Sequence, residues 1–415
     1  METLQKIVTI TLVMLLIVAF VSFQLNTAIA ESPINYINLS LDTIPLGITY
    51  CKGQGLAYIA LSGATSGEIR GIAVINVTKA LSAVEDCYDV YTLTIGNPDE
   101  HFGRFVTLDD DGNIWCQFGY MVEIDKVWKS FGNLTKFDTT TKEFTITNMQ
   151  SHPMTAICYI GYLWAMWKGF LQKINTTTLE VVESYNVSSG VDYGSCAYMV
   201  ADVDGIWISN IQNNEVIKFN TNNNSVEIVV EEIARPLGLA IKDDIVYVAE
   251  NANRPQEPPY IGNGTIAMVN KTTGDILGRI GTAEILNAGP FMVMFDSSGY
   301  LWYTDASGHV GFISKYVNET YSAISVYCYY MGEIEGHMFF TGKGSAYVGM
   351  TSCYQHPDMN DDGVIDGSDL AATAWSFGAY PEHPRWNSKV DINSDNAVDG
   401  SDLAIVAKHF GEKAV

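Results

Sequence analysis

The sequence is poor in positive charge and in charged residues of either sign. It has 23 Lys and Arg against 47 Asp and Glu in 415 residues, which gives a formal net charge of −24 at pH 7. So acidic a chain repels a phosphate backbone, which argues against a nucleic-acid partner and favours cations. Only 17% of the residues are charged and 47% are hydrophobic, which excludes disorder for the body of the chain.

A CxxC pair is also absent, which excludes a zinc ribbon and a thioredoxin motif. The chain has seven cysteines, and the odd number leaves at least one thiol unpaired in a monomer. The sequence assigns no disulfides among them. The cysteines are at positions 51, 87, 116, 158, 196, 328 and 353.

No long apolar run follows the N-terminal region. There, residues 7–23 are apolar, and Ala28-Ile29-Ala30 supplies the small residues that a signal peptidase reads. We predict a secretory signal over residues 1–30 and an extracellular mature chain, secreted or associated with a cell surface. The alternative is an uncleaved membrane anchor, because the run is at the lower limit for spanning a bilayer.

Asn-x-Ser/Thr sequons are frequent between this signal and the C-terminal region. In a glycosylating host they would be surface sites. The alternative is that a chain rich in Asn and Thr produces several by chance. The nine sequons begin at Asn38, Asn76, Asn133, Asn175, Asn186, Asn223, Asn263, Asn270 and Asn318.

Self-similarity organises the central part of the chain. A strand-like run with Gly or Pro and small apolar residues leads through a polar turn, often Asp-x-x-Gly, into a second strand with a central aromatic residue. Two further β-type runs follow in the first six units, for example residues 216–219 and 226–229. The aromatic residues recur every 40 to 57 positions, at Tyr58, Trp115, Trp164, Trp207, Tyr247, Trp302 and Tyr347.

Four strands per unit, repeated radially, is typical of a β-propeller. We therefore predict a mainly β fold with a seven-bladed β-propeller over residues 31–355. The last unit lacks outer strands, and a strand at residues 34–39 is expected to complete it, although that blade would still be one strand short. Six blades with a distorted closure, or a β-solenoid, are the alternatives.

Two segments carry a resemblance to a known family. Residues 289–305, GPFMVMFDSSGYLWYTD, and residues 206–219, IWISNIQNNEVIKF, resemble the blade motif of NHL-repeat and streptogramin-lyase-like propellers. The resemblance covers about residues 40–352. It implies an architecture rather than an activity, because propellers host binding proteins, lyases and hydrolases alike.

An acidic loop followed by a short helix occurs twice near the C-terminus, at residues 358–370 and 391–403, 33 residues apart. Oxygen side chains at loop positions 1, 3, 5, 9 and 12, with a carbonyl from position 7, are what Ca²⁺ requires. We predict one Ca²⁺ in each loop, two sites in all. The predicted ligands are Asp358, Asn360, Asp362, Val364 through its carbonyl, Asp366 through water, and Asp369; in the second loop they are Asp391, Asn393, Asp395, Ala397, Asp399 and Asp402.

A helix is expected after each loop, over residues 370–377 and 403–410. Leu370, Ala374 and Phe377 and their counterparts 33 positions later are predicted to form the face on which the helices pack. Loop-helix pairs without an entering helix resemble the dockerin domain, over residues 356–415. The resemblance implies docking to a cohesin-type module, in a two-fold, reversible mode, through Gly367-Ser368 and Gly400-Ser401.

Candidate catalytic and metal-binding residues in the predicted propeller are less clear from the sequence. Glu335-Gly336-His337 resembles the Glu-x-His of streptogramin lyases, but Phe291 and Thr351 stand where that family has a His and a carboxylate. His101, His152 and His337 are expected near the entrances of innermost strands, where they would hold a metal only if they converge. Glu250 and Asp305 end aromatic strands and are a candidate acid pair; the alternative, from the NHL resemblance, is a structural acid at a turn. Trp128 and Trp167, in expected loops, are candidate sugar-stacking residues, and the alternative is core packing.

We therefore expect a secreted, calcium-binding protein with a recognition propeller and a dockerin. Its partners would be a cohesin-type module and a glycan or protein ligand at the channel face of the propeller. Membrane contact is expected only if the signal is an uncleaved anchor. The alternative function is that of a hydrolase or a lyase delivered by its dockerin to a complex that degrades polysaccharides.

Overall fold

The structure of the chain is a computed structural model. It describes residues 35–39, 43–51, 54–62, 70–82, 87–93, 103–124, 127–147, 155–188, 196–251, 264–281, 289–297, 299–305, 309–313, 318–322, 327–343, 347–352, 357–360, 364–387, 389–392 and 397–411. The predicted signal, residues 1–30, lies outside this part. The chain divides into two compact units, and among the described residues the division falls between Met350 and Thr351.

The first unit consists of four-stranded antiparallel sheets, seven of them among the described residues. Six sheets run in simple chain order, and the seventh takes its fourth strand from the start of the unit. The strands, sheet by sheet, are β2 (Ile44–Cys51), β3 (Leu56–Ser62), β4 (Gly71–Asn76) and β5 (Tyr88–Thr92); β6 (Gly103–Leu108), β7 (Ile114–Ile124), β8 (Val127–Phe137) and β9 (Phe144–Ile146); β10 (Thr155–Tyr159), β11 (Tyr162–Trp167), β12 (Phe170–Asn175) and β13 (Val181–Asn186); β14 (Cys196–Asp202), β15 (Gly205–Asn210), β16 (Glu215–Asn220) and β17 (Ser225–Val230); β18 (Pro236–Lys242), β19 (Ile245–Glu250), β20 (Thr265–Asn270) and β21 (Ile276–Ile280); β22 (Pro290–Phe295), β23 (Leu301–Asp305), β24 (His309–Ile313) and β25 (Asn318–Ser322); and β26 (Tyr327–Ile334), β27 (His337–Lys343) and β28 (Tyr347–Ser352) with β1 (Asn35–Asn38).

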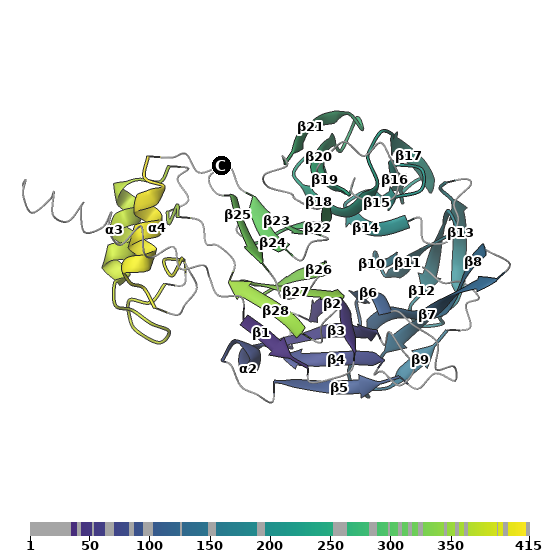
Figure 1. Cartoon of the computed structure of the whole chain (residues 1–415), viewed down its shortest axis with the longest axis horizontal. Coiled ribbons are helices and arrows are strands. Elements are labelled where there is room, and N and C mark those ends of the chain that lie inside the picture. Colours follow the sequence, from purple (N-terminus) through teal and green to yellow (C-terminus); the bar gives the residue numbers. More distant parts are fainter. Residues whose placement is uncertain are drawn as a thin grey trace, which may run out of the picture. The chain divides into compact units, whose positions relative to one another are not determined.

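The sheets form a closed ring around a centre. The first strand of each sheet contacts the first strand of the next, from β2 through β6, β10, β14, β18 and β22 to β26, and β26 contacts β2 (Figure 1). The strand predicted at residues 34–39 exists as β1, and it pairs with β28 from Asn35 opposite Met350 to Asn38 opposite Tyr347. This radial arrangement of antiparallel sheets is a β-propeller.

Aromatic residues in the second strands fill the spaces between sheets. Tyr58, Trp115, Trp207 and Trp302 have no exposed surface. Each large ring buries an extended apolar surface, so these residues dominate the energetics of packing between sheets. Trp207, for example, packs against side chains of β19 in the following sheet. The prediction of a central aromatic in the second strand is confirmed for the first six units.

The prediction was wrong for the last unit, where Tyr347 lies in the third strand, β28. The aromatics of its second strand are Phe339 and Phe340, which are both buried. A two-residue turn at Glu335 and Gly336, with φ of 50° and 74°, joins β26 to β27, as in a hairpin of type I′. The segment that resembled an innermost strand is therefore a second strand, and the sheet has all four strands.

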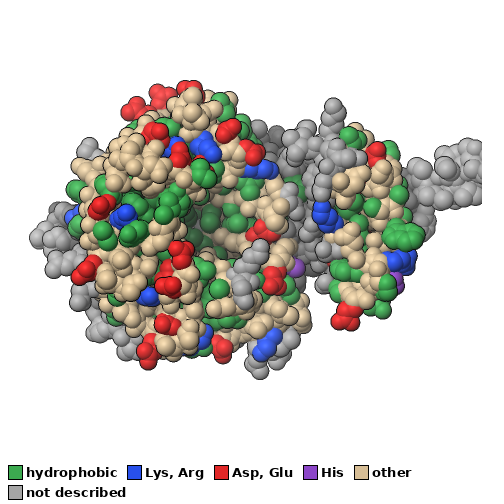
Figure 2. All heavy atoms as spheres, turned by 180° about the vertical axis from the view of Figure 1, so that it is seen from behind, with side chains coloured by type: hydrophobic (Ala, Val, Ile, Leu, Met, Phe, Trp, Pro, Cys, Tyr) green, Lys and Arg blue, Asp and Glu red, His purple; other side chains and the backbone are tan. Residues whose placement is uncertain are grey.

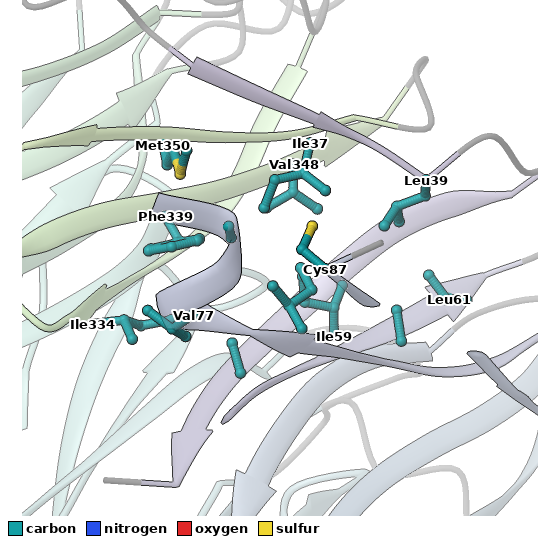
Figure 3. Close-up of a cluster of buried hydrophobic side chains, with 14 residues drawn as sticks. Ile37, Leu39, Ile59, Leu61, Val77, Cys87, Ile334, Phe339, Val348 and Met350 are labelled. Carbon is teal, nitrogen blue, oxygen red and sulfur yellow. The ribbon is translucent and has the colours of Figure 1, made fainter. Parts of the chain in front are cut away.

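The seam between this sheet and the first is closed by a hydrophobic cluster (Figure 3). Ile37 and Leu39, on or beside β1, belong to this cluster together with Val348 of β28 and Phe339 of β27. Ile59 from the first sheet and Val77 from the short helix α2 (Val77–Leu81) complete it. The closure of the ring thus rests on side-chain burial as well as on the β1–β28 ladder.

Two predicted loop residues lie in strands instead. Trp128 is in β8 and Trp167 ends β11. The hairpin formed by β7 and β8 is longer than its equivalents, with 11 residues in each strand, which explains why Trp128 falls outside the repeat spacing. In the described part of the chain, Cys51, Cys116 and Cys158 are free thiols.

The described residues of the second unit form two helices, α3 (Gly367–Ser376) and α4 (Gly400–Lys408). Each begins three residues earlier than predicted, because Asp366 and Asp399 are N-caps whose side chains accept from the helix, and Asp369 and Asp402 complete the capping boxes. No helix in the described residues is both long and apolar enough to cross a bilayer.

The prediction of the packing face was wrong: the buried residues of each helix lie one position earlier in the sequence than predicted. Asp369, Thr373 and Ser376 of α3 are buried, whereas Phe377 is 46% exposed and its counterpart Phe410 is 55% exposed. The loop carboxylates accept bonds from the backbone, and Leu370 is only partly buried against the core. The core consists of residues mainly from the loops and linker: Met359, Ile365, Ala379, Val390, Ile392, Val398 and Val406.

Candidate functional site

Two buried carboxylates start and end each acidic loop of the second unit. Asp358 and Asp369 of the first loop are 6% and 0% exposed, and Asp391 and Asp402 of the second loop are 4% and 0% exposed. Burying two groups of like charge in one short loop is costly unless they are compensated. These four side chains are therefore candidate parts of a cation site.

Backbone N–H groups organise the first loop around Asp369. Its Oδ1 accepts from the N–H of Met359 at 2.7 Å and of Asn360 at 3.3 Å, and its Oδ2 accepts from the N–H of Asp366 at 2.7 Å. The last residue of the loop is thereby held against the first residues, so that oxygen groups from both ends lie together. Thr373 Oγ1 then donates to the carbonyl of Asp369 at 3.0 Å.

The second loop repeats this geometry. Asp402 Oδ1 accepts from the N–H of Ile392 at 2.7 Å, and its Oδ2 accepts from the N–H of Asp399 at 2.8 Å. In both loops the residue before the helix, Asp366 or Asp399, also accepts from a Ser N–H at 2.7 Å. The sequence repeat is therefore also a repeat of hydrogen bonds.

The two loops are tied to each other by backbone bonds that obey the same two-fold relation. Gly378, after α3, donates its N–H to the carbonyl of Val398 in the second loop at 2.7 Å. Gly411, after α4, donates to the carbonyl of Ile365 in the first loop at 2.7 Å. Each helix thus ends on the loop of the other repeat, and the pair forms one folded unit.

The predicted ligands are only partly placed. Asp358, Asn360, Val364, Asp366 and Asp369 are described in the first loop, and Asp391, Ala397, Asp399 and Asp402 in the second; Asp362, Asn393 and Asp395 lie outside the described residues. Within the described part of the chain, no three His, Cys, Asp or Glu side chains form a metal-binding group. Carboxylate, amide and carbonyl oxygens still make a donor set that suits Ca²⁺, and the buried carboxylates fit such an ion.

The start of each helix presents small residues. Gly367 and Ser368 are exposed at the beginning of α3, and Gly400 is exposed at the beginning of α4, with Ser401 partly exposed. A larger side chain at Gly367 or Gly400 would meet nothing within 4 Å of its Cβ. The structure thus leaves the predicted docking positions accessible.

In the propeller, two tyrosines meet across the centre of the ring. The rings of Tyr198 on β14 and Tyr330 on β26 have centroids 5.8 Å apart. Their sheets are not neighbours, so the contact spans the central space. Figure 2 shows a hollow at the middle of the unit with hydrophobic side chains in its wall. This hollow offers aromatic and apolar surface to a ligand.

The candidate acid Glu250 has a structural role. Its carboxylate is 1% exposed and is paired with Arg279, at 2.8 Å from Nε and 3.2 Å from Nη2. It also accepts from the hydroxyl of Thr265 and from the N–H of Ala234. The hydrogen bond to Glu250 raises the pKa of the Arg279 guanidinium. The side chain of its proposed partner, Asp305, lies outside the described residues.

The Glu-x-His motif is likewise part of a turn. Glu335 Oε1 accepts from the hydroxyl of Tyr50 at 2.8 Å, and burial together with this bond raises the pKa of Tyr50 to about 12. His337 Nδ1 lies 2.9 Å from the carbonyl oxygen of Glu335. His337 opens β27, a second strand, rather than an innermost one. His101 and His152 lie outside the described residues.

Sequence reasoning missed the Tyr198–Tyr330 contact and the Glu250–Arg279 pair. Tyr198 and Tyr330 belong to different sheets, and only closure of the ring brings their side chains into contact. Arg279 lies on β21, and the alternation of Ile276, Gly278 and Ile280 with Leu277 and Arg279 was a signal that this residue could share a face with Glu250.

Comparisons with known proteins support the fold alone. No family model and no curated protein sequence matches the chain. Among solved structures, the WD40 β-propeller domain of Doa1 is similar, with a TM-score of 0.54 and 10% identity over 77% of this chain and 95% of that one. A chain of the mitotic checkpoint complex has a TM-score of 0.58 and 10% identity, over 79% and 94%. YCF48 from Cyanidioschyzon merolae has a TM-score of 0.56 and 8% identity, over 77% and 98%. The chain therefore has a β-propeller fold, which can serve as a binding module.

Proposed function

We propose that this chain is an exported recognition protein in which the propeller binds a ligand and residues 356–415 form a calcium-binding, dockerin-like module. The module would attach the propeller to a cohesin-type partner at a cell surface or in an extracellular complex. The observation that carries the proposal is the repeated loop in which a buried carboxylate, Asp369 or Asp402, organises the backbone around oxygen ligands.

Ca²⁺ would supply the positive charge that these loops lack. In the first loop Asp358, Asn360, Asp369 and the carbonyl of Val364 would hold it, together with Asp362. In the second loop the equivalent residues are Asp391, Asn393, Asp395, Ala397 and Asp402. Because the two loops are joined through Gly378 and Gly411, loss of one ion should loosen both.

The propeller is proposed to have seven blades of the NHL type, one for each four-stranded sheet. Its ligand would contact the hollow at the middle of the unit, where hydrophobic side chains form the wall. Aromatic rings stack on sugars and pack against proteins, and one similar structure comes from an assembly, the mitotic checkpoint complex. These points favour recognition of a protein or a glycan over catalysis, since Glu250 and Glu335 are engaged in structural hydrogen bonds.

Calorimetric titration of Ca²⁺ into the full chain tests the calcium sites. The double variant Asp369→Asn/Asp402→Asn removes two buried charges while keeping side-chain size, and Glu382→Gln removes an exposed charge outside the loops as the matched control. We expect two ions bound by the wild type and by the control, and a large loss of affinity in the double variant. Equal titration of all three proteins would contradict the proposal.

Docking is tested by binding to a panel of cohesin modules with and without a chelator. If either repeat can dock, Ser368→Lys and Ser401→Lys alone should bind almost normally, whereas the double variant should not bind. If the chelator does not release the complex, docking does not depend on bound calcium. If no cohesin module binds, the dockerin assignment is contradicted, whereas the result of the calcium titration is unaffected.

A further inference from the structure

The hairpins between the third and fourth strands of four consecutive sheets share one turn. In each, a side-chain oxygen at the end of the third strand accepts from the backbone N–H groups two and three residues later. The residues and distances are Asp138 with Thr140 and Thr141, both 2.8 Å; Asn175 with Thr177 and Thr178, both 2.8 Å; Asn220 with Asn222 at 2.9 Å and Asn223 at 3.3 Å; and Asn270 with Thr272 and Thr273, both 2.9 Å.

Three of these turns contain an Asn-x-Ser/Thr sequon. Asn175 and Asn270 are themselves the turn residues, and Asn223 lies inside the Asn220 turn. In all three the Asn Oδ1 accepts from the N–H of the Ser or Thr two positions on, and Ser225 Oγ also donates to Asn223 Oδ1 at 2.7 Å. Each Asn side chain is thus folded back on the backbone of its Ser or Thr, and in the Asn223 sequon the amide and the hydroxyl are in direct contact. Each Asn Nδ2 donates to no other residue in the described part of the chain.

A sequon within a strand provides the contrast. Asn133 lies in β8, and the two residues that follow it, Leu134 and Thr135, have no exposed surface. A transferase that must surround the whole motif cannot reach that hydroxyl in the folded protein. Asn223 is exposed and Asn175 and Asn270 are partly exposed, all in turns at the ends of hairpins.

The turns with sequons precede outer strands that expose apolar side chains. β13, β17 and β21 are the edges of their sheets and lie at the periphery of the ring (Figure 1). Their exposed large hydrophobic residues are Val181, Val182, Val226, Val229 and Leu277. An exposed apolar edge strand is a template for pairing with another chain unless something covers it.

We propose that Asn175, Asn223 and Asn270 are N-glycosylation sites whose glycans cover the apolar edges β13, β17 and β21. The donor is a lipid-diphosphate-linked oligosaccharide. The Asn Nδ2 forms a bond to C1 of the first sugar, the bond from C1 to the diphosphate oxygen breaks, the lipid diphosphate leaves with that electron pair, and the amide loses one proton to a base of the transferase. The modification rests on the export part of the proposed function.

The test uses the folded full chain, a purified single-subunit oligosaccharyltransferase and a lipid-diphosphate-linked oligosaccharide, with site occupancy measured by mass spectrometry of peptides. We expect glycan at all three turn sites and none at Asn133. The variants Asn175→Asp and Asn270→Asp should each lose one site without unfolding, because Asp138 makes the same turn with a carboxylate. Equal occupancy of Asn133 and the turns, or empty turns, would overturn the assignment.

A gain of modification is the complementary test. Asp138→Asn creates a sequon with Thr140, whose N–H already bonds the side chain of position 138. We expect this variant to acquire a fourth glycan, and its absence would show that the turn geometry does not determine acceptance. Transfer to purified protein requires neither signal cleavage nor calcium, so its failure would leave the calcium and docking results unaffected.

The covering role has a separate readout. Glycosylated protein should aggregate several-fold more slowly on mild heating, and bind less of a hydrophobic dye, than the same protein after enzymatic removal of the glycans. Identical aggregation and dye binding would refute the covering of the edges. Val182→Thr and Leu277→Thr in the unglycosylated protein should reproduce part of the protection, because they make the edges less apolar.

Discussion

The ring of Tyr198 lies against that of Tyr330, with 5.8 Å between centroids, although β14 and β26 belong to sheets that are not adjacent in the propeller. Such a contact couples opposite sides of the ring directly. Two aromatic rings from sheets that are not neighbours are therefore in contact within the ring. The contact should therefore stabilise the folded propeller.

A double-mutant cycle on the two tyrosines should reveal the coupling. Tyr198→Ala and Tyr330→Ala are each expected to lower the free energy of unfolding, and the double variant should cost less than their sum by about 0.5 to 1.5 kcal/mol, as found for aromatic pairs. Denaturant unfolding of the four proteins measures this. Strict additivity would mean that the rings touch without stabilising each other.

Breaking the Glu250–Arg279 pair should be costly. The Glu250 carboxylate is almost fully buried, so Arg279→Met would leave it without its cation, at a cost of about 3 kcal/mol, at the low end for such pairs because Arg279 is partly exposed. Glu250→Gln combined with Arg279→Met should recover part of the loss. A single variant as stable as the wild type would contradict this account of Glu250.

Tryptophans with and without a carboxylate partner should respond differently to the same change. The indole N–H groups of Trp115 and Trp302 donate to buried Asp109 at 2.8 Å and Asp296 at 2.7 Å. The indole N–H of Trp207 has no hydrogen-bond partner in the described structure. Changing Trp115 or Trp302 to Phe should therefore destabilise the protein by about 1.5 to 3 kcal/mol more than Trp207→Phe, measured by chemical unfolding.

Acid should weaken the Asp138 turn. Backbone N–H bonds from Thr141 and Thr140 lower the pKa of Asp138 below its ordinary value. Because the folded-state pKa is the lower one, the stabilising contribution is present above the unfolded pKa of about 3.9 and is lost as pH falls through the folded value. The stability advantage of the wild type over Asp138→Asn should therefore shrink between about pH 5 and pH 2. A constant difference would exclude the carboxylate as its source.

The repeat could be predicted from the sequence because aromatic residues such as Trp115 and Trp302 recur in the second strand of the first six units. The prediction fails at the last unit because the segment that begins at Gly336 has the composition of an innermost strand, whereas the positive φ of Gly336 serves a two-residue turn. The strand that closes the ring, β1, could also be predicted, since a β-type run before the first unit had no other partner. Contacts across the ring, such as Tyr198 with Tyr330, depend on closure and leave no local pattern.

In the C-terminal unit the loops were recognisable from spacing, and the helix packing was not. An apolar stripe at Leu370, Ala374 and Phe377 normally faces a core. Here the loop bonds of Asp369 fix the rotation of α3, and the buried row is Asp369, Thr373 and Ser376. Bonds between a carboxylate and a loop backbone outweighed the periodicity of the helix.

The register of β1 against β28 also determines how the propeller bears mechanical load. The chain before Asn35 and the chain after Met350 leave the ladder at the same end, because these two residues face each other in an antiparallel pair. If the segment before β1 and the unit after β28 were held by different partners, tension would peel the two strands apart one hydrogen bond at a time. A peeled ladder yields at lower force than one loaded along its strands, so the ring would open first at its closing strand.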